Sequence, residues 1–538
     1  MQMPMHAAFR TIAVMAAMLM AAAAHGAPDA ASAQLLKSTS DHSKFKVLQQ
    51  DFQSGPEVTK ACLSCHTEAA RQLQLTQHWK WEFLNPDGRR LGKKNVINNF
   101  CTSVASNYAY CTTCHIGYGW KDDQFDFTAQ ENVDCLICHD TTGNYRKPSG
   151  FAGNVVTRDT EFPPGSGKVV KALKLRPIAQ EVAKTSRDNC GACHFFGGGG
   201  DGVKHGDLDS SLASPDKALD VHMDATGNNF ACATCHMTEG HQVPGSRYAP
   251  TAVDKGGAHL RGKERTGNPT TCQSCHGQAP HKANLAKLND HTDKVACQTC
   301  HIPAYARGGI ATKMAWDWST AGRMGPDGKP LVKTDAKGRV IYTAAKGHFV
   351  LAENVVPEYA WFNGKVTYTL LGDRIEKSDQ PTRINHFEGS ASDGKSTIWP
   401  VKVFRGKQAY DPVNQTLAVL HMAGNDDTAF WTNFNWEKAV AAGMASVGAP
   451  FSGQVDFVST ESMWPITHMV APAQSALKCR DCHASDGRLE KVSGIYIPGR
   501  GSDHATWLDG IGWALAALAL FGALAHGSGR IFVSRRRT

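Results

Sequence analysis

The chain has 538 residues, with 57 lysines and arginines against 49 acidic residues and a formal net charge of +8. It contains 17 cysteines and 24 histidines, and only 41% of its residues are hydrophobic. The hydrophobic fraction is slightly low for an ordinary packed core, so we expect a bound group to fill part of the interior, and the length allows two to four domains.

Residues 1–27 are predicted to be a signal peptide. Arg10 supplies a positive charge, the apolar run from Thr11 to Ala24 follows, and small residues near Ala24 and Ala27 offer cleavage sites. The alternative is an N-terminal membrane anchor, although the run is short for a membrane span. Both interpretations carry the rest of the chain across a membrane.

Eight C-x-x-C-H motifs follow, numbered one to eight here in chain order. This pattern is the attachment signature of c-type haem, because two thiols at this spacing reach the two vinyl groups of a porphyrin and the histidine ligates the iron. Zinc or iron–sulfur sites are the alternative, but the histidine directly after every pair and the predicted export argue against them. The motif residues are Cys62, Cys65, His66; Cys111, Cys114, His115; Cys135, Cys138, His139; Cys190, Cys193, His194; Cys232, Cys235, His236; Cys272, Cys275, His276; Cys297, Cys300, His301; and Cys479, Cys482, His483.

Eight covalently bound haems also change how the charge is interpreted. Haem propionates are negative and would cancel much of the +8 excess, so we infer no nucleic-acid partner.

Sixteen of the 17 cysteines lie in these motifs, and Cys101 is left over. It has no second free thiol for an intramolecular disulfide. In an exported protein such a cysteine is either reactive or paired with another molecule, and the alternative is an inert buried thiol.

Second axial ligands must come from the histidines outside the motifs. Thirteen of them lie between the predicted signal peptide and the C-terminal apolar stretch, which is enough for most haems to be bis-histidine and low-spin. Those in short polar segments near motifs are favoured, namely His42, His78, His205, His222, His241, His281 and His468; the others are His259, His291, His348, His386, His421 and His504.

The spacing of the motifs predicts the domain organisation. Seven motifs crowd into residues 28–301, too densely for a separate domain around each haem, so neighbouring haems must contact one another and form a wire. Residues 302–478 hold no motif, and runs such as RVIYT and KVTYTLL between turn signals predict β-hairpins. Residues 479–500 carry the eighth motif. The predicted fold is mainly α with extensive loops, wrapped around a haem chain, with a small β-rich haem-free insertion.

A glycine-rich segment, GGGGDGVKH, covers residues 197–205. Four glycines permit a tight turn or a close approach of the backbone to a flat cofactor. Lys204 in this segment is either an iron ligand, an anion-binding charge or a solvated surface side chain.

The C-terminal region predicts a transmembrane helix over residues 507–527. An apolar stretch runs from Gly510 to Ala525, Trp507 and Trp513 lie at its outer end, and a basic tail over residues 528–538 follows. The arginines of this tail place it in the cytoplasm under the positive-inside rule. The alternative is a buried core helix.

Several longer segments resemble the octahaem tetrathionate reductase family. They include NNFCTSVASNYAYCTTCHIGYGW, NCGACHFFGGGGDGVKHGDLD, VACQTCHIPAYARGG and MAWDWSTAGR, and the resemblance runs from about Asp41 to about Leu489. It implies a periplasmic octahaem enzyme that reduces tetrathionate and can reduce nitrite and hydroxylamine.

The resemblance also implies site residues. The active haem of the family is the second, carried here by Cys111, Cys114 and His115, with a cysteine upstream that matches Cys101. A lysine replaces the usual histidine as the other axial ligand, and Lys204 is the first candidate, before Lys184 and Lys147.

The sequence therefore predicts a reductase that is periplasmic and anchored in the inner membrane by its C-terminal helix. A quinol dehydrogenase or a small cytochrome would supply electrons, and a small anionic or nitrogen-oxide substrate would accept them. The alternatives are nitrite or hydroxylamine reduction at the same haem, and a membrane-anchored electron conduit without a substrate of its own.

Overall fold

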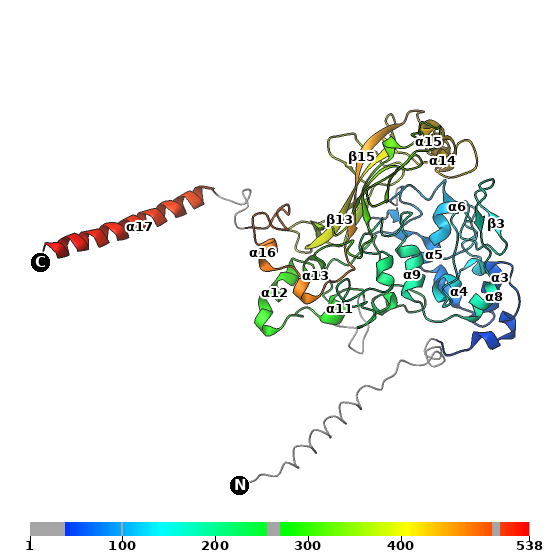
Figure 1. Cartoon of the computed structure of the whole chain (residues 1–538), viewed down its shortest axis with the longest axis horizontal. Coiled ribbons are helices and arrows are strands. Elements are labelled where there is room, and N and C mark those ends of the chain that lie inside the picture. The colour runs from blue at the N-terminus through cyan, green and yellow to red at the C-terminus, as the bar shows by residue number, and fades with distance from the viewer. Residues whose placement is uncertain (1–37, 98–99, 256–269, 498–505, 537–538) are drawn as a thin grey trace, which may run out of the picture.

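The computed structural model describes residues 38–97, 100–255, 270–497 and 506–536 (Figure 1). The predicted signal peptide, the candidate ligands His259 and His504, and the last two residues of the basic tail lie outside the described residues.

Short helices and loops make up the region of the first seven motifs (Figure 1). Several motifs themselves form one helical turn, since residues i, i+3 and i+4 of a helix share one face and this turn places both thiols and the histidine on the same side. The helices of this region are α3 (Gly55–Leu63), α4 (Ala69–Gln74), α5 (Gln77–Lys80), α6 (Tyr108–Cys111), α7 (Leu136–His139), α8 (Leu175–Gln180), α9 (Arg187–His194), α10 (Cys232–Cys235), α11 (Gln273–His276), α12 (Ala286–Asp290) and α13 (Cys297–His301).

Two small hairpins accompany these helices, and single turns of 3-10 helix connect many of them. The hairpins are β1 (Phe83–Leu84) with β2 (Arg90–Leu91), and β3 (Thr160–Glu161) with β4 (Val169–Val170). The 3-10 turns are η1 (His42–Lys44), η2 (Lys46–Leu48), η3 (Thr112–Cys114), η4 (Gln130–Asn132), η5 (Ser210–Ala213), η6 (Ala283–Leu285), η7 (His291–Asp293), η8 (Trp318–Thr320) and η9 (Ala473–Ser475).

A nine-stranded mixed sheet dominates the region between motifs seven and eight. Its main path runs β11-β15-β13-β5-β8-β7-β6, and β9 and β14 also pair with β13. Its strands are β5 (Thr312–Asp317), β6 (Val332–Thr334), β7 (Val340–Thr343), β8 (Gly347–Ala352), β9 (Glu358–Phe362), β11 (Thr382–Arg383), β13 (Thr397–Asp411), β14 (Thr416–Leu417) and β15 (Asp456–Pro465), and β10 (Val366–Tyr368) pairs separately with β12 (Asn385–Phe387).

The central strand β13 is buried along its first eight residues, as expected of a strand covered on both faces. One side of the sheet packs against α14 (Phe430–Asn433) and α15 (Trp436–Ser446) in the largest hydrophobic cluster of the described chain. Phe100, just before Cys101, belongs to the same cluster, and its ring lies 4.5 Å from that of Phe404. The sheet therefore packs directly against the segment that leads into the second motif.

After the sheet, the chain returns to the motif region. Leu477 N–H donates to Cys300 O at 3.0 Å, and Ala471 N–H donates to His301 O at 2.9 Å. These bonds place α16 (Cys479–Cys482), which carries the eighth motif, beside α13 (Figure 1). Motifs seven and eight are 182 residues apart in sequence but adjacent in space.

The prediction of a mainly α fold with a small β-rich insertion needs correction. Short helices and loops do surround the motifs, but the sheet is a major part of the body rather than a small addition. Residues 302–478 are also integrated with the motif region through the cluster around Phe100 and the return of the chain to α13.

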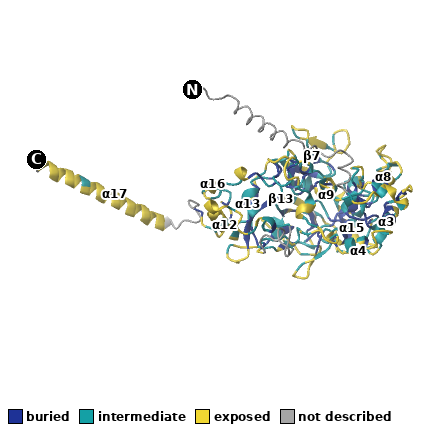
Figure 2. Ribbon diagram, turned by 90° about the horizontal axis from the view of Figure 1, so that it is seen from below, coloured by how far each residue is buried: buried dark blue, intermediate teal, exposed yellow. Residues whose placement is uncertain are grey.

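The last described element is α17 (Thr506–Arg535), which projects from the body (Figure 1). Within residues Trp507–Arg535, an 18-residue window has a mean hydropathy of 1.8, so the helix is long and apolar enough to cross a membrane. The apolar side chains of α17 are exposed (Figure 2), unlike those of a buried core helix. The helix continues past residue 527, so the predicted basic tail begins as its last turns rather than as a separate segment.

A helix of 30 residues is about 45 Å long, more than the roughly 30 Å of a bilayer core. We therefore predict that truncation after about Gly501 releases a soluble protein with its haems, whereas the full-length chain fractionates with membranes and resists a high-salt wash. Fractionation of both forms with haem staining measures this. Recovery of the full-length chain in the soluble fraction would contradict it.

Candidate functional site

One continuous cavity of about 3730 Å³ runs through the body, and all 17 cysteines of the chain line it. Its walls also carry seven of the eight motif histidines. Thiols and imidazoles that converge on one apolar space fit covalently attached c-type haems. The cavity accounts for the low hydrophobic content of the sequence, because the cofactors take the place of packed side chains.

Six motif histidines face a second histidine across this cavity. A metal–imidazole bond is about 2 Å long, so two imidazoles on opposite faces of one iron have ring centres roughly 6 Å apart. The observed ring-centre distances are 6.4 Å for His66 and His42, 6.1 Å for His194 and His78, 6.4 Å for His236 and His468, 6.0 Å for His276 and His222, 6.1 Å for His301 and His281, and 6.1 Å for His483 and His291.

The third motif has a less direct partner. Burial lowers the pKa of His241, and the nearby rings of His139 and His66 lower it further. Because His66 already faces His42, His241 is the histidine available to His139. Its Nδ1 lies 2.8 Å from Oε1 of Gln72, which fixes the ring.

Two predicted roles need correction. His205 lines the cavity, but its ring packs edge-on against Trp464 at 5.5 Å, and no motif histidine faces it among the described residues. His291, which is not among the favoured candidates, faces His483. The signal for His291 in the sequence is its position six residues before the seventh motif.

Three other candidates do not line the cavity. His348 is exposed on β8, and His386 lies on β12. The ring of His421 is held by Ser106 and by Asp426, whose Oδ2 lies 3.1 Å from Nε2.

The second motif breaks the pattern. The ring of His115 is buried away from the cavity, and its Nε2 donates to the carbonyl of Trp79 at 2.8 Å. Burial lowers its pKa to about 3, so the ring is neutral. Five aromatic rings surround it, those of Trp79, Trp81, Trp120, Phe125 and Phe127. This geometry contradicts the prediction that His115 is an axial ligand, because the ligating nitrogen is turned into an aromatic cage.

Lys204 lies on the cavity wall near this motif. Its side chain is buried, its Nζ lies 5.0 Å from the centre of the Trp464 ring, and Cys114 is among the groups close enough to influence its pKa. Burial, followed by the positive charges of Arg247 and Lys93, lowers its pKa well below the ordinary value. A neutral amine has a lone pair to offer a metal, which an ammonium group lacks.

The glycine-rich segment makes room for this lysine. A Cβ on Gly198, whose φ is +82°, would lie 2.6 Å from the Phe100 ring and 3.2 Å from Cβ of Lys204. A larger residue at this position would therefore collide with both neighbours, which explains the glycines without any nucleotide-binding role.

The sheet holds the Lys204 segment in place. Lys402 on β13 is fully buried, and its Nζ donates to the carbonyls of Val203 at 3.0 Å and Lys204 at 2.8 Å. Thr312 on β5 donates from Oγ1 to the carbonyl of Gly202 at 2.8 Å. The position of Lys204 thus depends on strands more than 100 residues away in sequence.

The other two lysine candidates lie in different environments. Lys147 is committed to an ion pair with Asp134 at 3.1 Å and to the carbonyls of His115 and Gly117. Lys184 is exposed, and it follows Ala183, whose carbonyl lies 2.8 Å from Nδ1 of His139. Lys184 therefore lies beside the third motif and not the second.

Cys101 lies on the cavity wall in a positively charged surround. Lys346 and Lys313 act on its thiol, and Lys313 itself packs over the rings of Trp316 and Phe349 at 3.6 and 3.7 Å. Burial raises the pKa of Cys101, and the two lysines oppose this shift without reversing it. The two lysines thus favour the thiolate of Cys101, but burial outweighs them.

Contacts between thiols of different motifs give the order of neighbours. Four pairs of motifs are joined by hydrogen-bonding thiols. They are motifs one and three (Cys62–Cys135), two and four (Cys114–Cys193), four and five (Cys190–Cys232), and six and seven (Cys272–Cys297). Electrostatic contacts link the remaining neighbours, through Cys138–Cys190, Cys235–Cys275 and Cys300–Cys482. The order is one-three-four-five-six-seven-eight, with motif two as a branch from motif four.

Several known proteins are similar to this chain. Residues 61–140 match the family described as cytochrome c554 and c-prime, and residues 313–486 match the family described as bacterial cytochrome c. An uncharacterised protein of Archaeoglobus fulgidus is 26% identical over 250 residues, which is 38% of this chain and 80% of that protein. The crystal structure of octahaem cytochrome c from Shewanella oneidensis is 41% identical, with a TM-score of 0.74 over 86% of this chain and 99% of the other.

The facing pair His291 and His483 predicts different outcomes for two substitutions. His291→Ala should convert one low-spin haem to high-spin, because the eighth motif loses its second imidazole, whereas His205→Ala should leave the number of low-spin haems unchanged. Electron paramagnetic resonance counts them, and intact mass checks that haem loading is equal. The reverse result would assign His205 as the ligand.

Proposed function

The chain belongs to the octahaem c-type cytochromes, and we propose that it is a membrane-anchored periplasmic reductase whose substrate reacts at the second motif. Covalent c-type haem gives this protein a redox function. The specific proposal is reduction of tetrathionate to thiosulfate.

We assign eight haems, one to each motif, with seven held between two histidines. The second haem would be held by Lys204 as its side-chain ligand, since His115 is turned away and the amine of Lys204 is buried and neutral in character. Electrons carried by the haems would reach this site through the contact between motifs two and four. The observation that carries the proposal is this single break in the pattern of paired imidazoles, at the motif nearest to Cys101.

The charges around Cys101 support an anionic substrate. Lys346 approaches the glycine-rich segment, with Nζ 3.8 Å from the Cβ position of Gly199, and Lys313 is buried beneath the same wall. Neither lysine has an acidic partner in an ion pair among the described residues. A dianion such as tetrathionate would be attracted by Lys346 and by the protonated form of Lys313, whose pKa burial lowers to about 7.

Cys101 supplies the sulfur chemistry in this proposal. Its thiolate would attack one central sulfur of tetrathionate, releasing one thiosulfate and leaving the other on Cys101 as a mixed disulfide. Two electrons from the haem chain would then cleave that bond, giving the second thiosulfate and the free thiolate. Attack needs the thiolate, and the raised pKa of Cys101 makes the approach of Lys313 and Lys346 to the thiol important.

The electron donor would be a quinol dehydrogenase or a small cytochrome of the same compartment. The position of α17 supports this, because a membrane helix directly after the eighth motif would keep motifs seven and eight near the membrane surface.

Nitrite or hydroxylamine reduction is the second candidate. A haem with one side-chain ligand leaves a coordination position for a small substrate, and such a substrate has no need of a sulfur nucleophile. An electron conduit without a substrate would need neither the altered second motif nor Cys101.

We predict that Lys204→Ala changes the ligation of a single haem. Because Lys204 would be the one side-chain ligand of the second haem, the high-spin signal of that haem should change, while the low-spin signals of the other seven haems stay the same. Electron paramagnetic resonance measures this. The matched control is Lys184→Ala, which removes a lysine beside the third motif and should change nothing. An unchanged spectrum for Lys204→Ala would refute lysine ligation at this position.

We predict that Cys101→Ser retains all haems and lowers tetrathionate turnover at least about tenfold, a loss of roughly 1.4 kcal/mol of transition-state stabilisation. Nitrite and hydroxylamine turnover should fall much less. Oxidation of the chemically reduced protein by each substrate in stopped flow measures all three rates, and Thr102→Ser, at the next position of the same cavity wall, is the control.

Equal tetrathionate turnover in Cys101→Ser and the parent protein would refute a catalytic thiol and favour the nitrogen substrates. Failure of the parent protein to turn over any of the three, with fast electron exchange with a redox partner, would favour the conduit.

A further inference from the structure

The Nδ1 atoms of several paired histidines have hydrogen-bond partners, and these partners differ in charge. In five histidines Nδ1 lies within hydrogen-bond distance of a neutral carbonyl or amide oxygen. These are His139 with Ala183 O at 2.8 Å, His236 with Pro244 O at 2.9 Å, His241 with Gln72 Oε1 at 2.8 Å, His281 with Asn289 Oδ1 at 2.9 Å, and His291 with Lys287 O at 2.8 Å.

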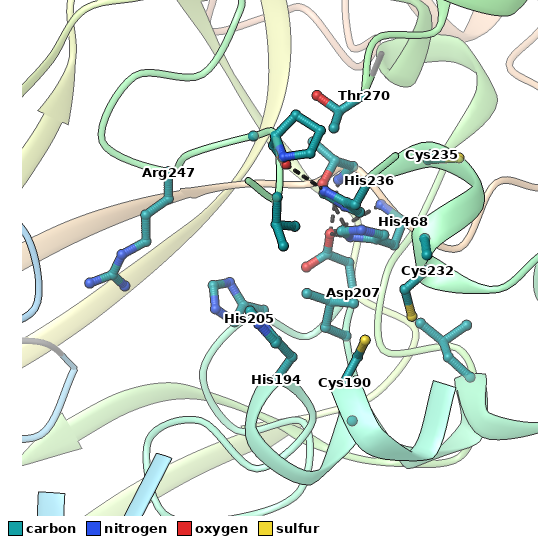
Figure 3. A pocket seen from close by; sticks show the side chains of 18 of the residues that line it. Cys190, His194, His205, Asp207, Cys232, Cys235, His236, Arg247, Thr270 and His468 are labelled. Carbon is teal, nitrogen blue, oxygen red and sulfur yellow. Dashed lines mark hydrogen bonds and ion pairs between the residues drawn. The ribbon is translucent and has the colours of Figure 1, made fainter. Parts of the chain in front are cut away.

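His468 differs from these five because its partner is a carboxylate. Its Nδ1 lies 3.1 Å from Oδ2 of Asp207, while its ring faces His236 across the cavity (Figure 3). The nearest comparable acid is Asp220, whose Oδ1 is 4.0 Å from Nδ1 of His222, too far for a hydrogen bond. His468 therefore combines a ring that faces a motif histidine with a carboxylate at hydrogen-bond distance.

The geometry of Asp207 is fixed independently of the ring. Oδ2 also accepts from the backbone N–H groups of Thr467 at 2.9 Å and His468 at 3.1 Å. Its side chain is 2% exposed, so its charge is poorly screened by water. A buried carboxylate held in this way acts on His468 as a fixed negative partner.

We propose that Asp207 lowers the reduction potential of the haem at the fifth motif, the one attached through Cys232 and Cys235. A carboxylate that accepts a hydrogen bond from an axial imidazole increases the basicity of that ligand. The more basic ligand and the nearby negative charge both favour the ferric form, so the one-electron reduction to the ferrous form becomes less favourable. Asp207 is thus a positioning and tuning residue and makes no contact with substrate.

The place of the fifth motif gives this tuning a function. Its thiols contact Cys190 of motif four on one side and approach Cys275 of motif six on the other. It therefore separates motifs six, seven and eight from the group of one to four that includes the second motif. An electron that has passed the fifth motif toward motifs one to four can return only by an uphill transfer through this low-potential haem. This would help two electrons to accumulate near the second motif, where a two-electron reduction needs them.

The inference rests on the proposed pairing of His236 with His468 and does not depend on which substrate is reduced. Asp207→Asn is nearly isosteric, and its remaining carbonyl oxygen can still accept the same N–H groups. We expect this change to shift the ferric–ferrous equilibrium of one haem toward the ferrous form at least tenfold, about 59 mV for one electron, while all haems stay low-spin. A potentiometric titration followed by absorbance and electron paramagnetic resonance measures both properties.

Gln72→Glu provides the reciprocal test at the third motif. It introduces a carboxylate at the partner atom of His241 and should lower the reduction potential of one haem. This variant tests the effect of a carboxylate on a facing histidine even if Asp207→Asn does not fold. Superimposable titrations of Asp207→Asn and the parent protein would overturn the inference, as would a Gln72→Glu variant with no shift.

His468→Ala separates the tuning from the pairing on which it rests. It should convert one low-spin haem to high-spin, and an unchanged spectrum would overturn the inference by removing the ligand through which Asp207 is proposed to act. None of these measurements involves tetrathionate, so failure of the proposed substrate leaves them valid.

Discussion

Pairs of histidine rings that face each other about 6 Å apart across one cavity are the contacts on which the rest of the structure depends. Most motif helices have only four to nine residues, too short to be stable alone in water. A haem bonded to the two thiols of one motif and ligated by two facing imidazoles would connect such segments directly. The His236–His468 pair, for example, ties α10 to a segment more than 200 residues further along the chain.

The sheet completes the site of the second motif. It carries Lys402, which holds the carbonyls of the Lys204 segment, and Lys313, which acts on Cys101. The region without a haem motif therefore supplies His468, which faces His236, and much of the charge around the candidate reaction site. Its large hydrophobic cluster gives these groups a rigid base that the loops of the motif region lack.

The helical turn α5 serves two haem sites in opposite ways. His78 faces His194 of the fourth motif, whereas the carbonyl of the next residue, Trp79, accepts the hydrogen bond from Nε2 of His115. The same turn thus completes one pair of imidazoles and removes another histidine from the cavity. This coupling explains how a chain with eight identical motifs can make one of them chemically different.

The sequence by itself determined the cofactor attachment, because two thiols and a histidine at fixed local spacing suffice for it, and it also determined the leftover thiol of Cys101 and the apolar C-terminal helix. Only the tertiary structure decided which histidine faces which motif. It places His291, and not His205, opposite a motif histidine, and it turns the ring of His115 away from the cavity. Those choices depend on contacts between segments up to hundreds of residues apart, such as the aromatic cage around His115 and the strands behind Lys204, and local spacing carries no information about them.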